Sequence, residues 1–470
     1  MSGPSRQPAQ TSSSPQDTLY EARKKLYVRA VSGVFANWRW VMVWLTQLVF
    51  YGLPWLSWND RQAVLFHLAE RKFYLFGWVF WPQDVFFLAV LLIISAYALF
   101  FFTAIAGRLW CGYACPQTVY TEIFMWIEQK IEGDHIRRQK LDQAEMSAPK
   151  ALRRGGKFLV WGLFSLWTGF TFVAYFSPLE ELLRSIPVFG FGPWELFWIL
   201  FYAAFTYLFA GVMREQVCTY MCPYARFQAV MFDPDTLVIT YDEERGEPRG
   251  ARRKGIDPKA VGKGDCIDCG ICVQVCPTGI DIRNGLQYMC IGCAACIDAC
   301  DQVMEKMDYP KGLIRYSTQN AIDGVYTDKE IPKHVFRPRT LFYIAVVSVI
   351  TLAFFYTLAM RIPMRADVIR DRLTLSREVE NGQIENLYQL RIINMENRPH
   401  HYRISATGIE GLRVETGNEV TIAPLSTVNH NVVLRADPAV LKRPSQPVVF
   451  TIQADEDAGI VREAKSSFLK

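Results

Sequence analysis

The sequence predicts a multi-domain membrane protein with five transmembrane α-helices, a cytoplasmic α+β insert of the bacterial two-cluster ferredoxin type, and a C-terminal all-β sandwich of immunoglobulin-like architecture. Three observations predict this fold class. Uncharged apolar stretches long enough to cross a bilayer recur along the chain, eight cysteines have ferredoxin spacing, and the C-terminal residues change to an apolar period of two. A chain of 470 residues has room for two or three domains.

Shifts in composition divide the chain into five parts. These are a tail rich in Ser, Pro and Gln with a basic cytoplasmic segment (1–37), a region of four transmembrane helices (38–232), the ferredoxin domain (233–338), a fifth transmembrane helix (339–362) and the β-domain (363–470). The tail has the composition of a disordered segment.

The five expected spans carry no charged residue, and a helix needs about 20 apolar residues to cross the hydrocarbon core. They are Trp40–Trp58, Val85–Ala106, Phe158–Leu179, Leu196–Met213 and Leu341–Met360. Lys and Arg cluster before the first span, between the second and third, and between the fourth and fifth. This bias predicts that the N-terminus and the ferredoxin domain lie in the cytoplasm, and five spans then leave the β-domain on the outer side of the membrane.

The first apolar run is too long, and starts too late, for a cleaved signal peptide, so we expect an uncleaved anchor surrounded by membrane lipid. The net charge of +5 is explained by the basic cytoplasmic face and needs no nucleic-acid partner.

Eight of the twelve cysteines spell Cys-x2-Cys-x2-Cys-x3-Cys twice. A four-iron cluster needs four converging thiolates, and the fourth cysteine of each run ligates the other cluster. The spacing therefore assigns Cys266, Cys269, Cys272 and Cys300 to one [4Fe–4S] cluster, and Cys290, Cys293, Cys296 and Cys276 to the second. Zinc and disulfides are the alternatives, but zinc sites usually use two Cys-x2-Cys pairs and would leave the regular Cys-x3-Cys ends unused.

The β-domain is predicted from apolar residues that alternate with polar ones in short runs. The alternating apolar positions are Tyr402, Ile404 and Ala406, then Val428, His430, Val432 and Leu434, then Val448, Phe450, Ile452 and Ala454. About 100 residues of this pattern favour an immunoglobulin-like sandwich. No catalytic constellation is visible in it, so we interpret it as a docking or structural module.

The other four cysteines form a membrane repeat, Cys-x-Tyr-x-Cys-Pro, at Cys111/Cys115 and Cys218/Cys222. Each pair follows a span by five residues. The i, i+4 spacing predicts both thiols of a pair on one helix face, and two such faces would offer four soft ligands to Cu(I), zinc or an iron–sulfur centre. We interpret the four cysteines as a catalytic, metal-binding or redox-active site at the cytoplasmic edge of the bilayer. Copper, another metal and a dithiol relay all stay open, and ordinary buried cysteines are the alternative.

Two classes of redox protein are disfavoured. No His lies inside a span, so a membrane haem b pair has no ligands, and there is no nucleotide fingerprint for a nicotinamide. The remaining candidates are interpreted as ordinary residues: the copper-ligand types Met360, Met364, His400 and His401, and the membrane-edge carboxylates Asp84, Glu122 and Glu215.

The two membrane pairs, the ferredoxin run between the fourth and fifth spans, the outer β-domain and the segment Ala-Glu-Arg-Lys-Phe-Tyr-Leu-Phe-Gly-Trp (69–78) together resemble the FixG/RdxA family of cytochrome c oxidase accessory proteins, also called CcoG. The resemblance covers nearly the whole chain after the tail. One departure from the bacterial ferredoxin pattern is Asp301, which follows the second cysteine run where a Pro follows the first. Membrane ferredoxins of the NapH kind share the first two features but lack the outer domain.

The resemblance implies an oxidoreductase of the bacterial inner membrane, with a periplasmic β-domain. It implies that this protein reduces Cu(II) to Cu(I) for copper insertion during assembly of a cbb-type cytochrome c oxidase. It implies two [4Fe–4S] clusters, a metal such as copper at Cys111, Cys115, Cys218 and Cys222, and copper-handling and oxidase-assembly proteins as partners. The electron donor is left open between a cytoplasmic protein and a quinol, and the oligomeric state, a homodimer included, is open as well. The alternatives are a quinone-linked electron-transfer subunit like NapH and a non-catalytic assembly scaffold.

Overall fold

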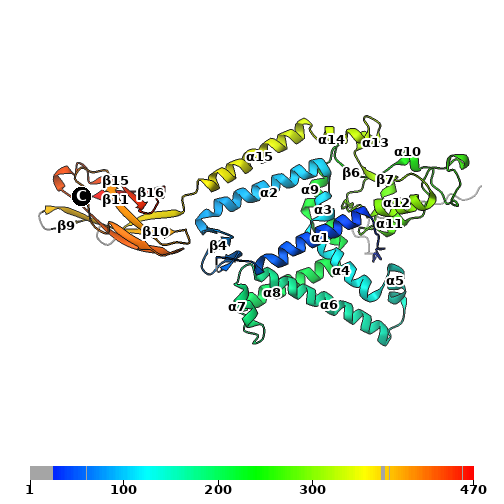
Figure 1. Cartoon of the computed structure of the whole chain (residues 1–470), viewed down its shortest axis with the longest axis horizontal. Coiled ribbons are helices and arrows are strands. Elements are labelled where there is room, and N and C mark those ends of the chain that lie inside the picture. Colours follow the sequence, from blue (N-terminus) through cyan, green and yellow to red (C-terminus); the bar gives the residue numbers. More distant parts are fainter. Residues whose placement is uncertain (1–24, 60, 372–375, 380–381, 458) are drawn as a thin grey trace, which may run out of the picture.

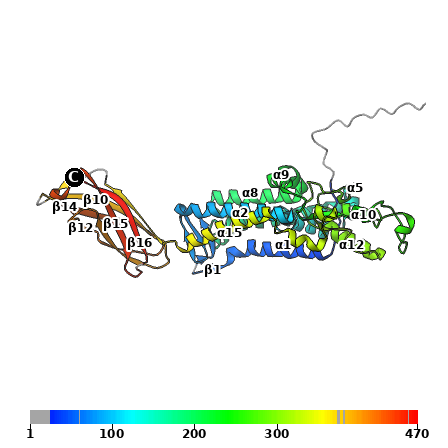
Figure 2. The same ribbon diagram turned by 90° about the horizontal axis from the view of Figure 1, so that it is seen from above.

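The chain is elongated, with its cysteine-rich segment at one end and its C-terminal strands at the other (Figures 1 and 2). The computed structural model describes residues 25–59, 61–371, 376–379, 382–457 and 459–470. The expected disordered tail therefore lies outside the described residues, apart from the basic segment that begins at residue 25. Long helices lie between the two ends of the molecule (Figure 1).

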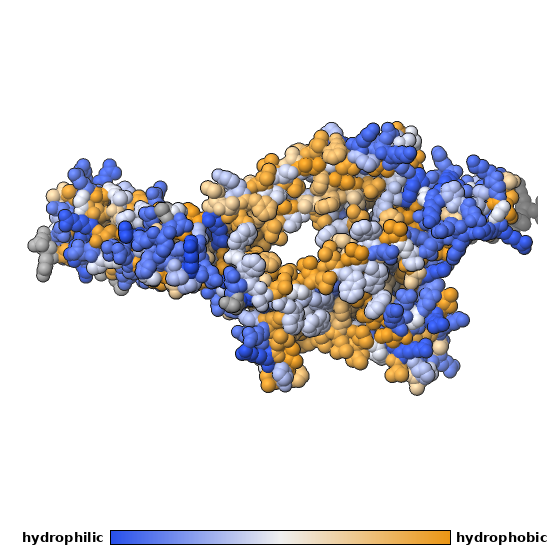
Figure 3. Space-filling model, in the orientation of Figure 1, coloured by the Kyte–Doolittle hydropathy of each residue, from blue (hydrophilic) through white to orange (hydrophobic). Residues whose placement is uncertain are grey.

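Four of these helices are long and apolar enough to cross a membrane. They are α2 (Val85–Ala106), α6 (Ala148–Val173), α8 (Pro193–Thr206) with its π-helical continuation Tyr207–Met213, and α15 (Pro338–Ala359). They correspond to the second to fifth predicted spans. Apolar surface dominates the middle of the molecule, whereas both ends are hydrophilic (Figure 3).

Two predicted spans have wrong boundaries, and a proline follows the end of each helix. The first helix, α1, runs from Val34 to Gly52 instead of Trp40–Trp58, and a 3₁₀ turn with Pro54 follows it. It contains Arg39 and is not among the four apolar candidates. The third predicted span, Phe158–Leu179, ends early because α6 stops at Val173, and Pro178 separates it from the short helix α7 (Leu179–Ser185).

The five long helices form two groups, with α2 against α15 and α6 against α8, and with α1 beside the second group (Figures 1 and 2). The α6–α8 contact is close, because a Cβ added at Gly169 would lie 2.2 Å from the carbonyl oxygen of Ile199. An opening between the two groups is visible in Figure 3. None of the apolar stretch of α2 is buried inside the protein, so lipid can cover it.

The β-domain is a sandwich of two antiparallel sheets. One sheet has the order β12-β14-β10-β8, with β9 also paired to β10, and the other has the order β13-β11-β15-β16. The strands are β8 (Met364–Arg370), β9 (Arg377–Glu378), β10 (Ile384–Asn394), β11 (His400–Thr407), β12 (Arg413–Thr416), β13 (Glu419–Ile422), β14 (Thr427–Ala436), β15 (Ser445–Ala454) and β16 (Val461–Leu469).

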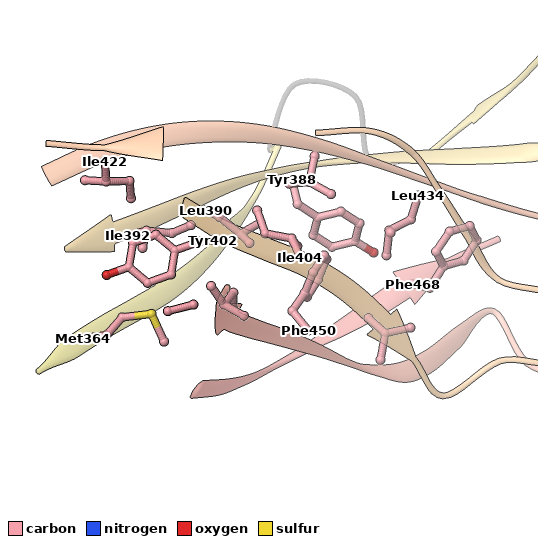
Figure 4. Close-up of a cluster of buried hydrophobic side chains, with 14 of the residues drawn as sticks. Met364, Tyr388, Leu390, Ile392, Tyr402, Ile404, Ile422, Leu434, Phe450 and Phe468 are labelled. Atoms are coloured by element: carbon pink, nitrogen blue, oxygen red, sulfur yellow. The ribbon is translucent and has the colours of Figure 1, made fainter. Parts of the chain in front are cut away.

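The core of the sandwich is built from the inward positions of the predicted alternation. Tyr402, Ile404, Val432 and Phe450 are among the buried side chains, which confirms the period-two pattern in β11, β14 and β15. Figure 4 shows Tyr402, Ile404 and Phe450 between the two sheets. The rings of Tyr388 and Phe450 meet edge to face with centroids 5.0 Å apart.

Short strands connect α1 to α2 at the end of the membrane helices that faces the β-domain. They are β1 (Ser57–Trp58), β2 (Arg61–Gln62), β3 (Val64–His67), β4 (Lys72–Leu75) and β5 (Trp78–Phe80), of which β3, β4 and β5 form one sheet. Leu425 of the β-domain packs against the buried cluster of this sheet.

Asp84 ties the β-domain to the membrane helices. Its carboxylate is buried at the start of α2, accepts a hydrogen bond from the main-chain N–H of Trp81 (3.1 Å), and pairs with Arg361 and Arg365 at the start of the β-domain. Sequence reasoning interpreted Asp84 as a solvated membrane-edge carboxylate. That interpretation is wrong, because two cations from a segment some 280 residues later in the chain enclose it.

The opposite end holds the ferredoxin domain and a set of short helices at the helix ends. Strand β6 (Val238–Tyr241) pairs with β7 (Ile314–Ser317). The helices are α3 (Leu109–Tyr113), α4 (Pro116–Glu132), α5 (His135–Gln143), α9 (Pro223–Met231), α10 (Glu243–Gly246), α11 (Ile271–Gln274), α12 (Ala295–Met307), α13 (Gln319–Ile322) and α14 (Ile331–His334).

We expect Asp84→Asn to loosen the β-domain from the membrane helices, because loss of one partner leaves two buried or half-buried cations uncompensated. Breaking a buried ion pair costs about 3–5 kcal/mol. The purified full chain should unfold at a lower temperature and be cleaved faster by protease near Arg361, with unchanged cluster absorbance. Asp367→Asn, an exposed change on neighbouring β8, is the control. Equal thermal unfolding midpoints for the two variants would contradict the role of Asp84 in holding the β-domain to the membrane helices.

Candidate redox site at the membrane edge

The two membrane cysteine pairs lie in turns, not on single helix faces as the i, i+4 spacing predicted. Cys111 is in α3, but Cys115 has extended dihedral angles and caps α4, whose first residue is Pro116. Cys218 is in a π-helical turn (Val217–Met221), and Cys222 is extended before Pro223, the first residue of α9. The proline disfavours helical geometry for the cysteine before it and starts the next helix instead.

The two halves of the repeat share a backbone turn four residues before the first cysteine. Gly107 has φ +52° and ψ −111°, and Arg214 in the equivalent position has φ +46° and ψ −111°. A side chain is strained in this region. Arg214 is held there by a bond from its Nε to the carbonyl of Gly211 (3.0 Å) and by an ion pair to Glu128 (2.9 Å).

The four membrane thiols lie close enough to influence one another. The pKa of Cys111 and of Cys218 is raised to about 12, mainly by burial; the neighbouring Cys115 contributes to both shifts, whereas Arg108 opposes both. Burial also raises the pKa of Cys115, and Cys222 adds to that shift. The two pairs therefore converge, with Arg108 as the nearby cation that favours thiolates.

Polar side chains hold the two cysteine pairs in place against the neighbouring helices. The Cys111 thiol donates to the Oε1 atom of buried Gln228 (3.4 Å). The Gln117 amide donates to the carbonyls of Phe209 (2.9 Å) and Arg214 (3.1 Å), which joins α4 to the second half of the repeat.

The eight ferredoxin cysteines gather in two sets. Burial raises the pKa of Cys300 to about 12, and Cys272, Cys266 and Cys269 are the thiols that add to it. Cys276, Cys290, Cys293 and Cys296 line one small cavity together with isoleucines and with Cys272 of the first set. Thiols around an apolar cavity fit the donor set of an iron–sulfur cluster, so each set of four has the residues to hold one.

The described residues, which include all twelve cysteines, contain no group of three or more His, Cys, Asp or Glu side chains arranged around one metal ion. A four-iron cluster spreads its ligands over a larger object than a single ion, so this finding leaves the ferredoxin sets unaffected. At the membrane pairs, capture of a single ion by three or four thiols would require the two turns to close further.

The membrane pairs and the ferredoxin domain meet directly. Cys111 and Cys218 pack against a buried layer that contains Val275, Ile291 and Cys293. The main chain of the first membrane turn also touches the main chain of the ferredoxin domain, because a Cβ added at Gly112 would lie 2.6 Å from the carbonyl oxygen of Gly292. Gly292 itself has φ +71°, a conformation that favours glycine.

Arg108 is the central residue of this contact, and the sequence indicated it only as a basic residue before the first pair. Its guanidinium is buried and donates to the carbonyls of Tyr288 and Cys290 (3.1 Å) in the ferredoxin domain, and to the carbonyl of Ala225 (2.6 Å) in α9. One side chain therefore joins both halves of the repeat to the ferredoxin domain.

A second charged centre, which is also buried, holds α4, α5 and α6 together. Glu128 pairs with Arg138 (2.8 Å), Arg214 (2.9 Å) and Lys157 (3.5 Å). Burial disfavours its charged form, but the three cations outweigh that effect and hold the pKa of Glu128 below its ordinary value. The sequence signal was weak, because Arg138 and Lys157 are only two of several basic residues between the second and third predicted spans.

Met360, Met364, His400 and His401 do not form a metal site among the described residues. Met364 is in the sandwich core, Met360 is exposed at the end of α15, and His400 is buried beside Glu396 (2.8 Å). His401 contacts the hydroxyl of Thr421.

Comparison with known families matches three parts of the chain. A 4Fe-4S dicluster domain matches residues 213–319, a 4Fe-4S binding domain matches residues 88–133, and the immunoglobulin-like fold at the C-terminus of FixG, described as a candidate oxidoreductase, matches residues 354–470. The dicluster match includes all eight ferredoxin cysteines together with Cys218 and Cys222, and the second match includes Cys111 and Cys115.

Curated relatives extend the similarity over most of the chain. The nitrogen fixation protein FixG of Rhizobium meliloti is 39% identical over 85% of this chain and 81% of its own length. Protein RdxB of Cereibacter sphaeroides is 41% identical over 83% of each chain. The ferredoxin-type protein NapH of Escherichia coli is 26% identical over 52% of this chain and 82% of its own length.

We expect Gly112→Val to separate the membrane pairs from the ferredoxin domain, since the added carbons would overlap the main chain of Gly292. Overpacking costs about 1–3 kcal/mol. The variant should insert into membranes but yield less cluster absorbance per protein and faster hydrogen exchange at residues 288–293. Gly162→Val, where a Cβ meets nothing within 4 Å, is the control. Unchanged exchange in the Gly112 variant would show that the contact is not tight.

Proposed function

The chain belongs to the FixG/RdxA family, and from this premise we propose that it is a membrane iron–sulfur oxidoreductase that reduces Cu(II) to Cu(I) for copper insertion into a cbb-type cytochrome c oxidase. One observation carries the proposal. The thiols of Cys111 and Cys218 pack against the layer that contains Cys293, so a soft-ligand site lies next to a cluster-binding cysteine. Close contact between two redox sites is what single-electron transfer requires.

The ferredoxin domain is the source of electrons in this proposal. When bound, its two [4Fe–4S] clusters supply one-electron oxidation and reduction. The chain's own contribution is to hold two sets of four thiols and to press the set that includes Cys293 against the membrane pairs.

Copper is the substrate. Cu(II) takes one electron from the ferredoxin domain and leaves as Cu(I), while the cysteines stay reduced and no sulfur bond is formed between them. Soft thiolates favour Cu(I) over harder ions, so the four membrane cysteines stabilise the product. Arg108 offsets part of the negative charge of the thiolates.

We also propose that α1 is a fifth span. The N-terminal end of α1 is bonded to the ferredoxin domain, because the main-chain N–H of Ala36 donates to Asp298 (2.7 Å). Its C-terminal end leads into the strands beside the β-domain, and Tyr51 bonds to Thr168 of α6 (2.8 Å). Because α1 begins at the ferredoxin domain and ends beside the β-domain, it has the position of a helix that crosses the membrane, although Arg39 lowers its mean hydropathy.

The sidedness follows from charge. Basic residues gather on the ferredoxin side, so we propose that this side is cytoplasmic and that the β-domain is periplasmic, where it would dock copper-handling or oxidase-assembly proteins. Cu(I) is then formed at the cytoplasmic edge of the membrane, so a partner protein must carry it from there to the oxidase.

The two cysteine sets should have separable roles. Cys266→Ser should lose cluster absorbance, whereas Cys218→Ser should keep it and lose cupric reduction. The measurement is anaerobic: reduce the purified protein, remove reductant, add Cu(II), and count Cu(I) with a colorimetric chelator while following cluster absorbance. Loss of the clusters in the Cys218 variant, or Cu(I) formation at the normal rate without Cys218, would reject this division of labour.

A further inference from the structure

A cleft lies between α1, α4 and the ferredoxin domain, beside Cys293. Its outer part, about 150 Å³, is lined by Arg39, Trp40, Glu122, Met125 and Trp126, with Val275 and Pro277 of the ferredoxin domain behind them. A smaller cavity adjoins it, shares Arg39, Glu122, Met125 and Pro277, and ends at Cys218 and Cys293. The proposed function assigns no role to this cleft.

The polar centre of the cleft is an incompletely bonded arginine. The Arg39 side chain is buried, at 7% exposure, and its Nε atom has no hydrogen-bond partner among the described residues. Its closest carboxylate, Glu122, is 3.9 Å away, which is an ion-pair distance but too long for a hydrogen bond. A buried donor without an acceptor is costly, so a ligand oxygen at this place would be stabilising.

The outer end of the cleft is aromatic and faces the bilayer edge. The rings of Trp40 and Trp126 meet edge to face with centroids 6.3 Å apart, and Trp126 is 46% exposed. Trp40 belongs to the first half of α1, and tryptophan near the end of a spanning helix is typical of the membrane interface. The cleft therefore joins a lipid-accessible aromatic entrance to a cluster-binding cysteine, with a cation and a carboxylate between them.

We propose that this cleft binds the ring of a membrane quinol, which donates the electrons for the proposed function. The inference therefore rests on that function. A quinol is flat, enters from the lipid and carries oxygens that accept from Arg39. Its oxidation breaks two O–H bonds and forms two C=O bonds. One electron goes to each of the two clusters, and the protons leave one after the other through the Glu122 carboxylate to cytoplasmic water.

The quinol step is tested with decylubiquinol added anaerobically to the oxidised, purified full chain in detergent, with the loss of cluster absorbance followed in time. Glu122→Gln should slow this reduction about 100-fold, the lower end of the usual contribution of general acid–base catalysis. Glu180→Gln, at a 77% exposed residue of α7, should not. Dithionite should reduce all three proteins equally, which shows that the clusters are intact.

Binding is tested separately with a photoreactive azidoquinone on the same protein, with mapping by mass spectrometry. The label should fall on residues 116–132 and 34–44 and be displaced by unlabelled quinone. Met125→Trp, which fills the cleft, should lose it while retaining dithionite-reducible clusters. Label confined to the lipid-facing helices α2 and α15, or equal quinol rates in wild type and Glu122→Gln, would overturn the proposal.

The failure of this inference is distinguishable from failure of the proposed function. Protein reduced with dithionite and then mixed with Cu(II) tests cupric reduction without a quinol. If that reaction proceeds but decylubiquinol leaves the clusters oxidised, the copper function stands and the quinol site is rejected. If decylubiquinol reduces the clusters but Cu(II) does not reoxidise them, the quinol site stands and copper is not the acceptor.

Discussion

The buried guanidinium of Arg108 is the interaction on which the redox end of the molecule depends. In the described part of the chain it is solvated by main-chain carbonyls rather than by a carboxylate, and two of them come from segments 117 and 182 residues away. A buried charge with unmade hydrogen bonds is costly, so these segments are held at bonding distance. The short path between the membrane thiols and Cys293 follows from that constraint.

The membrane repeat is symmetric in sequence and in backbone but not in the use of its arginines. The same left-handed turn precedes both pairs, with Gly107 in one half and Arg214 in the other. Arg108 faces the ferredoxin domain, whereas Arg214 turns to Glu128 and fixes the repeat to the helices of the membrane edge. One half of the repeat therefore serves docking, and the other serves anchoring.

The sequence predicted those features that follow from local spacing. The cysteine runs are covered by a dicluster family match, and the strand periodicity of residues such as Phe450 is confirmed by burial. The predictions from sequence were wrong where a proline or a distant partner decides the local structure. Pro116 breaks the expected helix at Cys115, and Asp84 is enclosed by arginines from a distant segment. The cleft beside Arg39 was invisible because its walls come from three separate parts of the chain.

The contact between Gly112 and Gly292 also orders the biogenesis of the protein. Its two sides are 180 residues apart, so the membrane turns are synthesised well before the surface that covers them. Contacts of such long sequence separation form late in folding. A chain whose ferredoxin domain has not folded would leave Cys111 and Cys218 uncovered, so these cysteines gain their cover only after the ferredoxin domain has been synthesised.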